Sequence, residues 1–118
     1  MKNIQENIKR YVNAWNETTP EAIKTAFEQC CAPDLTYTDK VTQKLTGIDE
    51  LTALAMISHE RFPGRTFFVM TEPEYFEGQA YYTWGIHLPG VGDRAGHDFM
   101  EYNEDEAITR VVGFLPVV

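Results

Sequence analysis

The chain has 118 residues and a mass of 13.5 kDa, which is the size of one domain with one hydrophobic core. Its 43% hydrophobic and 24% charged residues are typical of a globular protein and argue against intrinsic disorder. The net charge of −8 disfavours a protein that binds the phosphate backbone of nucleic acids. We therefore expect one domain over residues 1–118 that does not bind nucleic acid.

The two cysteines, Cys30 and Cys31, are neighbours in the chain. Neighbouring cysteines rarely reach the geometry of a relaxed disulfide, so the sequence predicts no disulfide framework. The amino-terminal residues lack the apolar segment of a signal peptide, and no apolar run approaches the roughly 20 residues of a membrane span. These patterns predict a cytoplasmic protein with no membrane segment.

Helical periodicity dominates the first half of the chain. Apolar residues recur every three or four positions over Ile4–Trp15, which predicts an amphipathic helix. Thr19-Pro20 has the residue types of a helix cap followed by a first helical position, and Pro33 is expected to end this second helix. A third helix is predicted over Ile48–Arg61.

Strand-forming residues dominate the second half, after one short strand expected at Leu35–Thr38. The longer predicted strands cover 66–70 with an extension to 75, 79–88, 97–103 and 107–115. A loop at Pro89–Asp93 separates two of them. Three helices followed by long strands indicate an α+β fold, in which a curved, mainly antiparallel sheet packs over the helices and leaves one end open as a pocket.

Several short segments carry a resemblance to a known superfamily. They are Arg10–Asn16, Ala32–Asp39, Gly47, Phe62–Gly64, Gly96–Tyr102 and Ile108–Leu115. In this order they resemble the NTF2-like cone of ketosteroid isomerase and the SnoaL-like polyketide cyclases, over nearly the whole chain. The resemblance implies a cystatin-like cone, with three N-terminal helices on a curved mixed sheet that encloses a pocket. This fold hosts isomerases, cyclases, hydrolases, dehydratases and non-catalytic binders.

Three residues match the working positions of the isomerase. Tyr11 lies in an Arg-Tyr-Val context where the family keeps an oxyanion-binding tyrosine. Asp39 follows the first strand, where the family has its general base, although Lys40 replaces the usual proline after it. Asp98 lies where the family keeps a carboxylic acid protonated by its apolar surroundings.

The chemistry of these residue types is consistent with that comparison. Abstraction of a proton beside a carbonyl needs a base and donors that hold the developing enolate oxygen. Asp39 is the candidate base, and Tyr11 and a neutral Asp98 are the candidate donors. Packing alone also explains Tyr11 on its apolar helix stripe, and Asp39 beside Lys40 is also typical of a solvated turn. A mid-strand Asp98 needs a partner or a raised pKa once buried.

Other side chains are candidates for binding a ligand beside these three. They are Trp15, Phe62, Trp84, Met100, Tyr102 and His87. Met100 and Tyr102 share a strand face with Asp98, whereas His97 is expected to face away from it. His87 is a candidate proton carrier. Since the histidines and cysteines lack the spacing of metal ligands, we expect no metal. The sequence also lacks a P-loop and a dinucleotide-binding glycine motif, so we expect no other cofactor.

Three functions remain open at this point. The first is a cofactor-independent isomerase or cyclase acting on a small hydrophobic carbonyl compound. The second is a non-catalytic protein that binds a small hydrophobic molecule. The third is a dimeric interaction module with a vestigial pocket. Aromatic pairs such as Tyr75-Phe76 and Tyr81-Tyr82 place apolar residues on both strand faces, and the superfamily commonly dimerises there, so we expect a homodimer through the outer sheet face.

Overall fold

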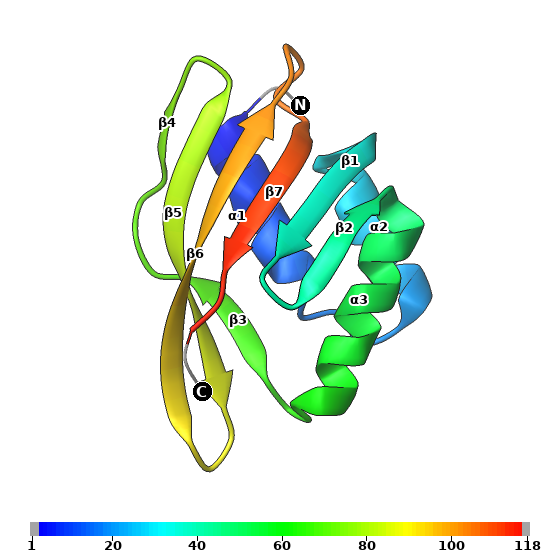
Figure 1. Ribbon diagram of the computed structural model, residues 1–118, viewed down its shortest axis with the longest axis vertical. Helices are drawn as coiled ribbons and strands as arrows, with labels where there is room; N and C mark the ends of the chain where they lie inside the picture. The colour runs from blue at the N-terminus through cyan, green and yellow to red at the C-terminus, as the bar shows by residue number, and fades with distance from the viewer. Residues whose placement is uncertain (1–2, 117–118) are drawn as a thin grey trace.

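The computed structural model describes residues 3–116, which form an α+β fold (Figure 1). The helices are α1 (Ile4–Ala14), α2 (Pro20–Glu28) and α3 (Ile48–Arg61). The strands are β1 (Cys31–Asp39), β2 (Thr42–Thr46), β3 (Thr66–Val69), β4 (Glu74–Phe76), β5 (Gln79–Leu88), β6 (Gly92–Tyr102) and β7 (Ile108–Phe114). None of these helices is long and apolar enough to cross a membrane.

All seven strands belong to one mixed sheet in the order β2-β1-β7-β6-β5-β3, with β4 also paired to β5. Only the β1–β7 pair is parallel among the described strands, and the other pairs are antiparallel. The sheet is curved and stays open rather than closing into a barrel, and Figure 1 shows α1 crossing behind β6 and β7 while α3 lies beside β2. The predicted fold class is therefore confirmed.

Local sequence signals explain where the helices begin. The Asn3 side chain accepts a hydrogen bond from the Glu6 amide and caps α1. Thr19 caps α2 in the same way, with Pro20 in the first turn, as the sequence predicts. Gly47 precedes α3 with a φ of 93°, in the left-handed region that glycine tolerates best. The bounds of α3 are the predicted ones.

The core lies between the helices and the concave face of the sheet. Ile8 of α1 and Phe27 of α2 are fully buried, as are Leu35, Met100 and Val111 from the sheet. Each such side chain stabilises the fold by roughly 1.5–3 kcal/mol relative to exposure. The core fixes α1 against the sheet, and α1, α3 and the sheet line the pocket described below.

Two predicted boundaries in the first half are wrong. Helix α2 ends at Glu28, so Pro33 lies within β1 and does not end the helix. The short strand predicted at Leu35–Thr38 is the middle of the longer β1. Strand β2 was not expected, because it is a polar, largely exposed edge strand whose sequence carries no alternation of apolar residues.

The second half differs from expectation at two turns. Strand β3 ends at Val69 instead of continuing to Tyr75, and β4 pairs with a separate part of β5. Pro73 between them lacks the amide hydrogen that a continuous strand would need. Strand β6 begins at Gly92, five residues before the predicted start, and pairs with β5 from the Leu88–Gly92 hairpin onward.

Arg65 joins three elements beneath the pocket. Its side chain is buried, and its guanidinium donates hydrogen bonds to the carbonyls of Trp15 and Ala55 and to Ser58 Oγ. It also lies 4.7 Å from the centre of the Phe67 ring. Burial lowers the Arg65 pKa to about 10, which leaves the group charged at neutral pH. Arg65 therefore holds the ends of α1 and α3 against β3.

We predict that Arg65→Met lowers the free energy of unfolding by about 2–4 kcal/mol, because the carbonyls of Trp15 and Ala55 lose buried donors. Urea denaturation followed by circular dichroism measures this difference. The control, Lys9→Met on the exposed side of α1, is expected to stay within about 0.5 kcal/mol of the parent chain. Equal effects of the two substitutions would contradict the bridging role of Arg65.

Candidate functional site

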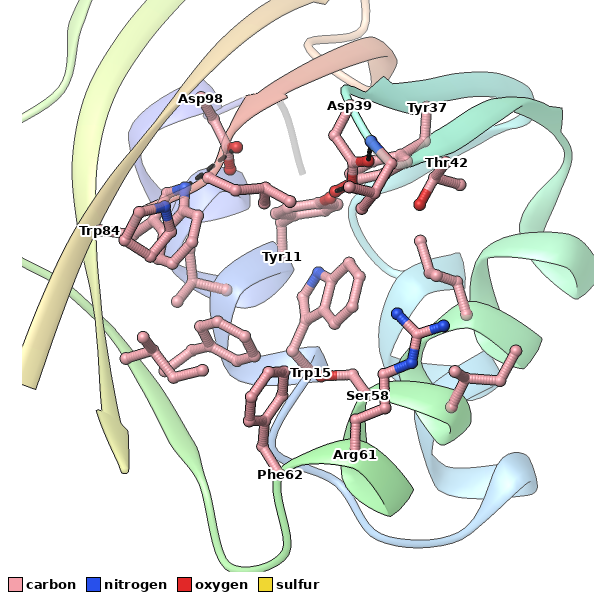
Figure 2. A pocket seen from close by; sticks show the side chains of 18 of the residues that line it. Tyr11, Trp15, Tyr37, Asp39, Thr42, Ser58, Arg61, Phe62, Trp84 and Asp98 are labelled. Atoms are coloured by element: carbon pink, nitrogen blue, oxygen red, sulfur yellow. Dashed lines mark hydrogen bonds between the residues drawn. The ribbon is translucent and has the colours of Figure 1, made fainter. Parts of the chain in front are cut away.

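A pocket of about 180 Å³ lies between α1, α3 and the concave face of the sheet (Figure 2). Its walls are mainly aromatic. The aromatic lining residues are Tyr11, Trp15, Tyr37, Phe62, Phe67 and Trp84. The rings of Trp15 and Phe67, and of Phe67 and Trp84, meet edge to face at centroid distances of 5.7 and 5.4 Å. Exposed Val41 and Phe62 belong to the rim, where the pocket opens.

Asp98 is a buried carboxyl at the end of the pocket away from Phe62. Its Oδ2 accepts a hydrogen bond of 2.5 Å from the Tyr82 hydroxyl, and its Oδ1 accepts one of 3.1 Å from Trp84 Nε1. Burial raises the Asp98 pKa to about 7, although these two donors oppose the rise; the charge of Asp39 adds to it. Asp98 therefore changes from its neutral to its ionised form near neutral pH.

Asp39 lines the same pocket from the last position of β1. Its Oδ2 accepts a hydrogen bond of 2.7 Å from the Tyr37 hydroxyl, and its Oδ1 accepts one of 2.9 Å from the Val41 amide. Burial, and then the bond to Asp39, raises the pKa of Tyr37, so Tyr37 stays a donor. The two donors fix the orientation of the half-buried Asp39 carboxyl at the end of β1.

Tyr11 contributes a buried hydroxyl group to the pocket. Its side chain is 2% exposed, and its oxygen has no hydrogen-bond partner within residues 3–116. Burial raises the Tyr11 pKa well above its usual range, and the charge of Asp98 raises it further, so the hydroxyl stays protonated. The Trp15 indole slightly opposes this rise without reaching hydrogen-bond geometry. A buried donor without an acceptor costs roughly 1–3 kcal/mol, which a ligand oxygen can recover.

Two glycines allow these groups to approach one another. Gly113 of β7 pairs with Asp98 of β6, and a Cβ at Gly113 would lie 3.1 Å from the Tyr37 oxygen and 3.5 Å from Asp98 Oδ1. A Cβ at Gly96 would lie only 2.3 Å from the Trp84 ring. Larger residues at these positions would therefore displace Tyr37 or Trp84 from its contact with a carboxyl.

The structure brings most of the predicted site residues together. Tyr11, Asp39, Asp98, Trp15, Phe62 and Trp84 all line the pocket. No hydrogen bond joins Tyr11 to Asp98, although both face the same space. Their catalytic and binding roles stay predictions, since placement in a pocket shows only that they are accessible to one ligand.

Three predicted ligand-binding residues do not line the pocket. Met100 lies on the same face of β6 as Asp98, but it is fully buried in the core beyond the pocket. Tyr102 lies farther along that face, at the end of the strand. His87 is on the outer face of β5, where its Nδ1 lies 2.6 Å from Asp93 Oδ1. Met100 and Tyr102 lie too far along β6 from the pocket, and strand alternation turns His87 to the outer face.

His97 faces away from Asp98, as predicted. Its Nδ1 lies 2.9 Å from Thr83 Oγ1, and its ring stacks on Tyr81 at 5.8 Å on the outer face of the sheet. Within residues 3–116, no group of three or more His, Cys, Asp or Glu side chains is arranged to hold a metal ion.

Sequence reasoning missed several residues that matter to the site. Tyr37 donates a hydrogen bond to Asp39. Strand alternation predicts that a residue two positions before Asp39 shares its face, so the sequence could have identified Tyr37. Tyr82 holds Asp98 because the two residues are paired across β5 and β6, and this register was not known from the sequence. Arg61 at the end of α3 also lines the pocket.

Comparison with known proteins supports the fold. No family model and no curated protein matches the sequence. A solved structure of a proposed isomerase of the SnoaL-like family from Agrobacterium tumefaciens matches with a TM-score of 0.86 and 25% identity, over 99% of this chain and 100% of that one.

Two further solved structures have the same fold. A hypothetical protein from Catenulispora acidiphila, with a ketosteroid isomerase-like fold and in complex with trimethylamine, matches with a TM-score of 0.75 and 17% identity, over 95% of this chain and 86% of that one. An NTF2-like protein of unknown function from Exiguobacterium matches with a TM-score of 0.72 and 15% identity, over 94% and 98%. The predicted resemblance to SnoaL-like, NTF2-like and ketosteroid isomerase-like folds is therefore confirmed.

We predict that Asp98→Asn changes how stability depends on pH. The folded-state pKa of Asp98 is raised to about 7, so its contribution to stability is complete below the unfolded-state value near 4 and is lost as pH rises through about 7. The asparagine variant lacks this titration. The melting temperature of the variant minus that of the parent should therefore increase between about pH 4 and pH 8. A difference that stays constant with pH would contradict a buried, titrating Asp98.

Proposed function

We propose that the pocket binds a small hydrophobic carbonyl compound and moves a proton within it without a cofactor, as an isomerase or cyclase does. The observation that carries this proposal is the buried Tyr11 hydroxyl, which shares the pocket with Asp98 and has no acceptor within residues 3–116. Asp39 opens on the same space. The SnoaL-like structure from Agrobacterium, described as a proposed isomerase, supports this class of reaction.

Tyr11 and Asp98 would bind the carbonyl oxygen of the ligand. Asp98 carries a proton below its pKa of about 7, and both Tyr82 and Trp84 donate to it, so this proton is available to a ligand oxygen. Negative charge grows on the carbonyl oxygen as the enolate forms. Donors held in an apolar pocket stabilise that charge more than water does, because they are already oriented.

Asp39 would act as the base. It takes the proton from the carbon beside the carbonyl, and the electrons of the broken C–H bond form the enolate. In an isomerisation, Asp39 returns the proton to a different carbon and the carbonyl re-forms. In a cyclisation, the enolate carbon attacks a second carbonyl carbon of the ligand, whose oxygen takes the proton. Tyr37 and Val41 keep the Asp39 carboxyl oriented for this transfer.

We predict that the protein converts cyclohex-3-enone into the conjugated cyclohex-2-enone, which ultraviolet absorbance follows directly. Asp39→Asn should lower kcat by about 10²–10⁴-fold by removing the base, and Tyr11→Phe by about 10²-fold by removing one oxyanion donor. The rate should fall as pH rises through about 7, where Asp98 loses its proton.

The control for this assay is Asp34→Asn, which removes an exposed carboxyl from the same strand as Asp39. Its rate should equal that of the parent protein. An assay in which the parent and Asp39→Asn rates are the same would overturn the catalytic proposal.

A second candidate function is binding without catalysis. The six aromatic rings of the pocket favour it, and the similar protein from Catenulispora was solved in complex with trimethylamine. A binding protein would be stabilised by an apolar ligand such as 2-naphthol, and this stabilisation would survive Asp39→Asn. Stabilisation of both the parent protein and Asp39→Asn by 2-naphthol, together with no turnover of cyclohex-3-enone, would favour this alternative.

The outer face of the sheet supports a homodimer. Tyr81, Phe99 and Val112 pair in one row across β5, β6 and β7, and His97 pairs with Phe114 in the next row. Tyr81 and Phe114 are 45% and 53% exposed. Phe99 and Val112 between them are half-buried. Exposed apolar side chains gathered on one sheet face are typical of an interface between subunits. A dimer that binds no ligand would instead favour an interaction module.

We predict that Phe114→Asp converts the dimer into a monomer, because the carboxylate would lose its solvation inside the interface. Sedimentation equilibrium measures the mass. Val91→Asp, on the exposed β5–β6 turn, is the control that should keep the parent's mass. A parent protein that is monomeric at micromolar concentration would rule the dimer out.

A further inference from the structure

One positively charged side chain lines the pocket. Arg61, the last residue of α3, is the only Lys or Arg among the described residues that line it. Figure 2 shows its guanidinium extending into the pocket, with Asp98 at the opposite end. Arg61 is exposed, so this group lies at the opening rather than in the core.

The Arg61 guanidinium has no salt-bridge partner within residues 3–116. Arg65, only four positions later, uses its donors on the carbonyls of Trp15 and Ala55 and on Ser58. The favourable interaction of a cation with the C-terminus of α3 explains a basic residue at position 61. It does not explain why the side chain lies along the pocket wall.

The donors of Arg61 match a carboxylate. A guanidinium presents several N–H groups in one plane and binds both oxygens of a carboxylate together. At the other end of the pocket the Asp39 carboxylate repels an anion. The charge of the whole chain, −8, repels anions as well, so a preference for an acid has to come from Arg61 locally.

We propose that the ligand of this pocket is a small, mainly apolar carboxylic acid that Arg61 holds by its carboxylate. Its carbonyl or hydroxyl oxygen then reaches Tyr11 and Asp98, and its apolar body packs against the wall that Trp15 and Phe67 form. This inference rests on the proposed function and adds the substrate class to it. The cavity of about 180 Å³ is close to the size of one that holds a benzene ring, so it suits one or two rings.

Two pairs of ligands test the inference by isothermal titration calorimetry. They are phenol with 4-hydroxybenzoate, and 2-naphthol with 6-hydroxy-2-naphthoate. Each pair differs only in a carboxylate, and the two lengths cover different spans between the opening and Tyr11. At about pH 6 the carboxylates are ionised and the phenols are not. The parent protein should bind at least one acid about tenfold more tightly than its neutral counterpart.

Arg61→Gln should abolish this preference, so that the variant protein binds the acid and its neutral counterpart with similar affinity. Arg61→Lys should keep part of the preference, since it keeps the charge without the planar donors. Lys9→Gln removes the same charge from the exposed side of α1 and should retain the parent's preference. The preference should also decrease as salt increases, because the opening is exposed to solvent.

The outcomes separate the two proposals. Neutral ligands that bind as tightly as their acids would overturn the role of Arg61 while leaving the proposed pocket function intact. A preference that survives Arg61→Gln would have the same consequence. Failure of all four compounds to bind the parent protein would overturn the carboxylic-acid proposal, whereas the proposed function is overturned separately by equal turnover of cyclohex-3-enone in the parent and Asp39→Asn. Thermal melting of each variant checks that it is folded before the titration.

Discussion

The burial of the Asp98 carboxyl is the constraint on which the site depends. An isolated carboxyl in an apolar region is costly, so it needs donors as well as a shifted pKa. Tyr82 and Trp84 supply those donors from the neighbouring strand β5. Gly96 in turn makes room for the Trp84 ring. A slip of one residue in the β5–β6 register would turn Tyr82 and Trp84 to the other face and leave the carboxyl without them.

The same arrangement gives the two carboxyls different surroundings. Asp98 is enclosed and bonded to side chains, and its pKa is raised to about 7. Asp39 is half-buried at the end of β1 and accepts bonds from the Tyr37 hydroxyl and the Val41 backbone amide. A site that needs one proton donor and one proton acceptor is built most simply by such a difference in environment. Gly113 keeps both groups close enough to serve one ligand.

Sequence periodicity predicted which residues face inward, but not how far along an element they lie. Asp98 and Met100 share a face of β6, yet only Asp98 reaches the pocket. The outer-face position of His87 follows from the sequence itself, since a residue three positions from Trp84 on a strand faces the other way. The contact of Tyr82 with Asp98 could not be predicted, because it depends on the pairing register of β5 and β6. Strand β2 could not be predicted either, because an exposed edge strand needs no pattern of apolar residues.

The polar groups of the pocket indicate what its ligand must resemble. Tyr11 has a buried hydroxyl without an acceptor, and Arg61 has a guanidinium without an anion, within the part of the chain described by the structure. The wall between them is apolar and is held in place by Arg65 and by the two 2.8 Å bonds between Asn16 and the Phe67 backbone. A wall fixed in advance loses little entropy on binding. An amphipathic molecule with polar groups at its two ends would therefore gain affinity at both ends, whereas a purely apolar one would leave Tyr11 without an acceptor.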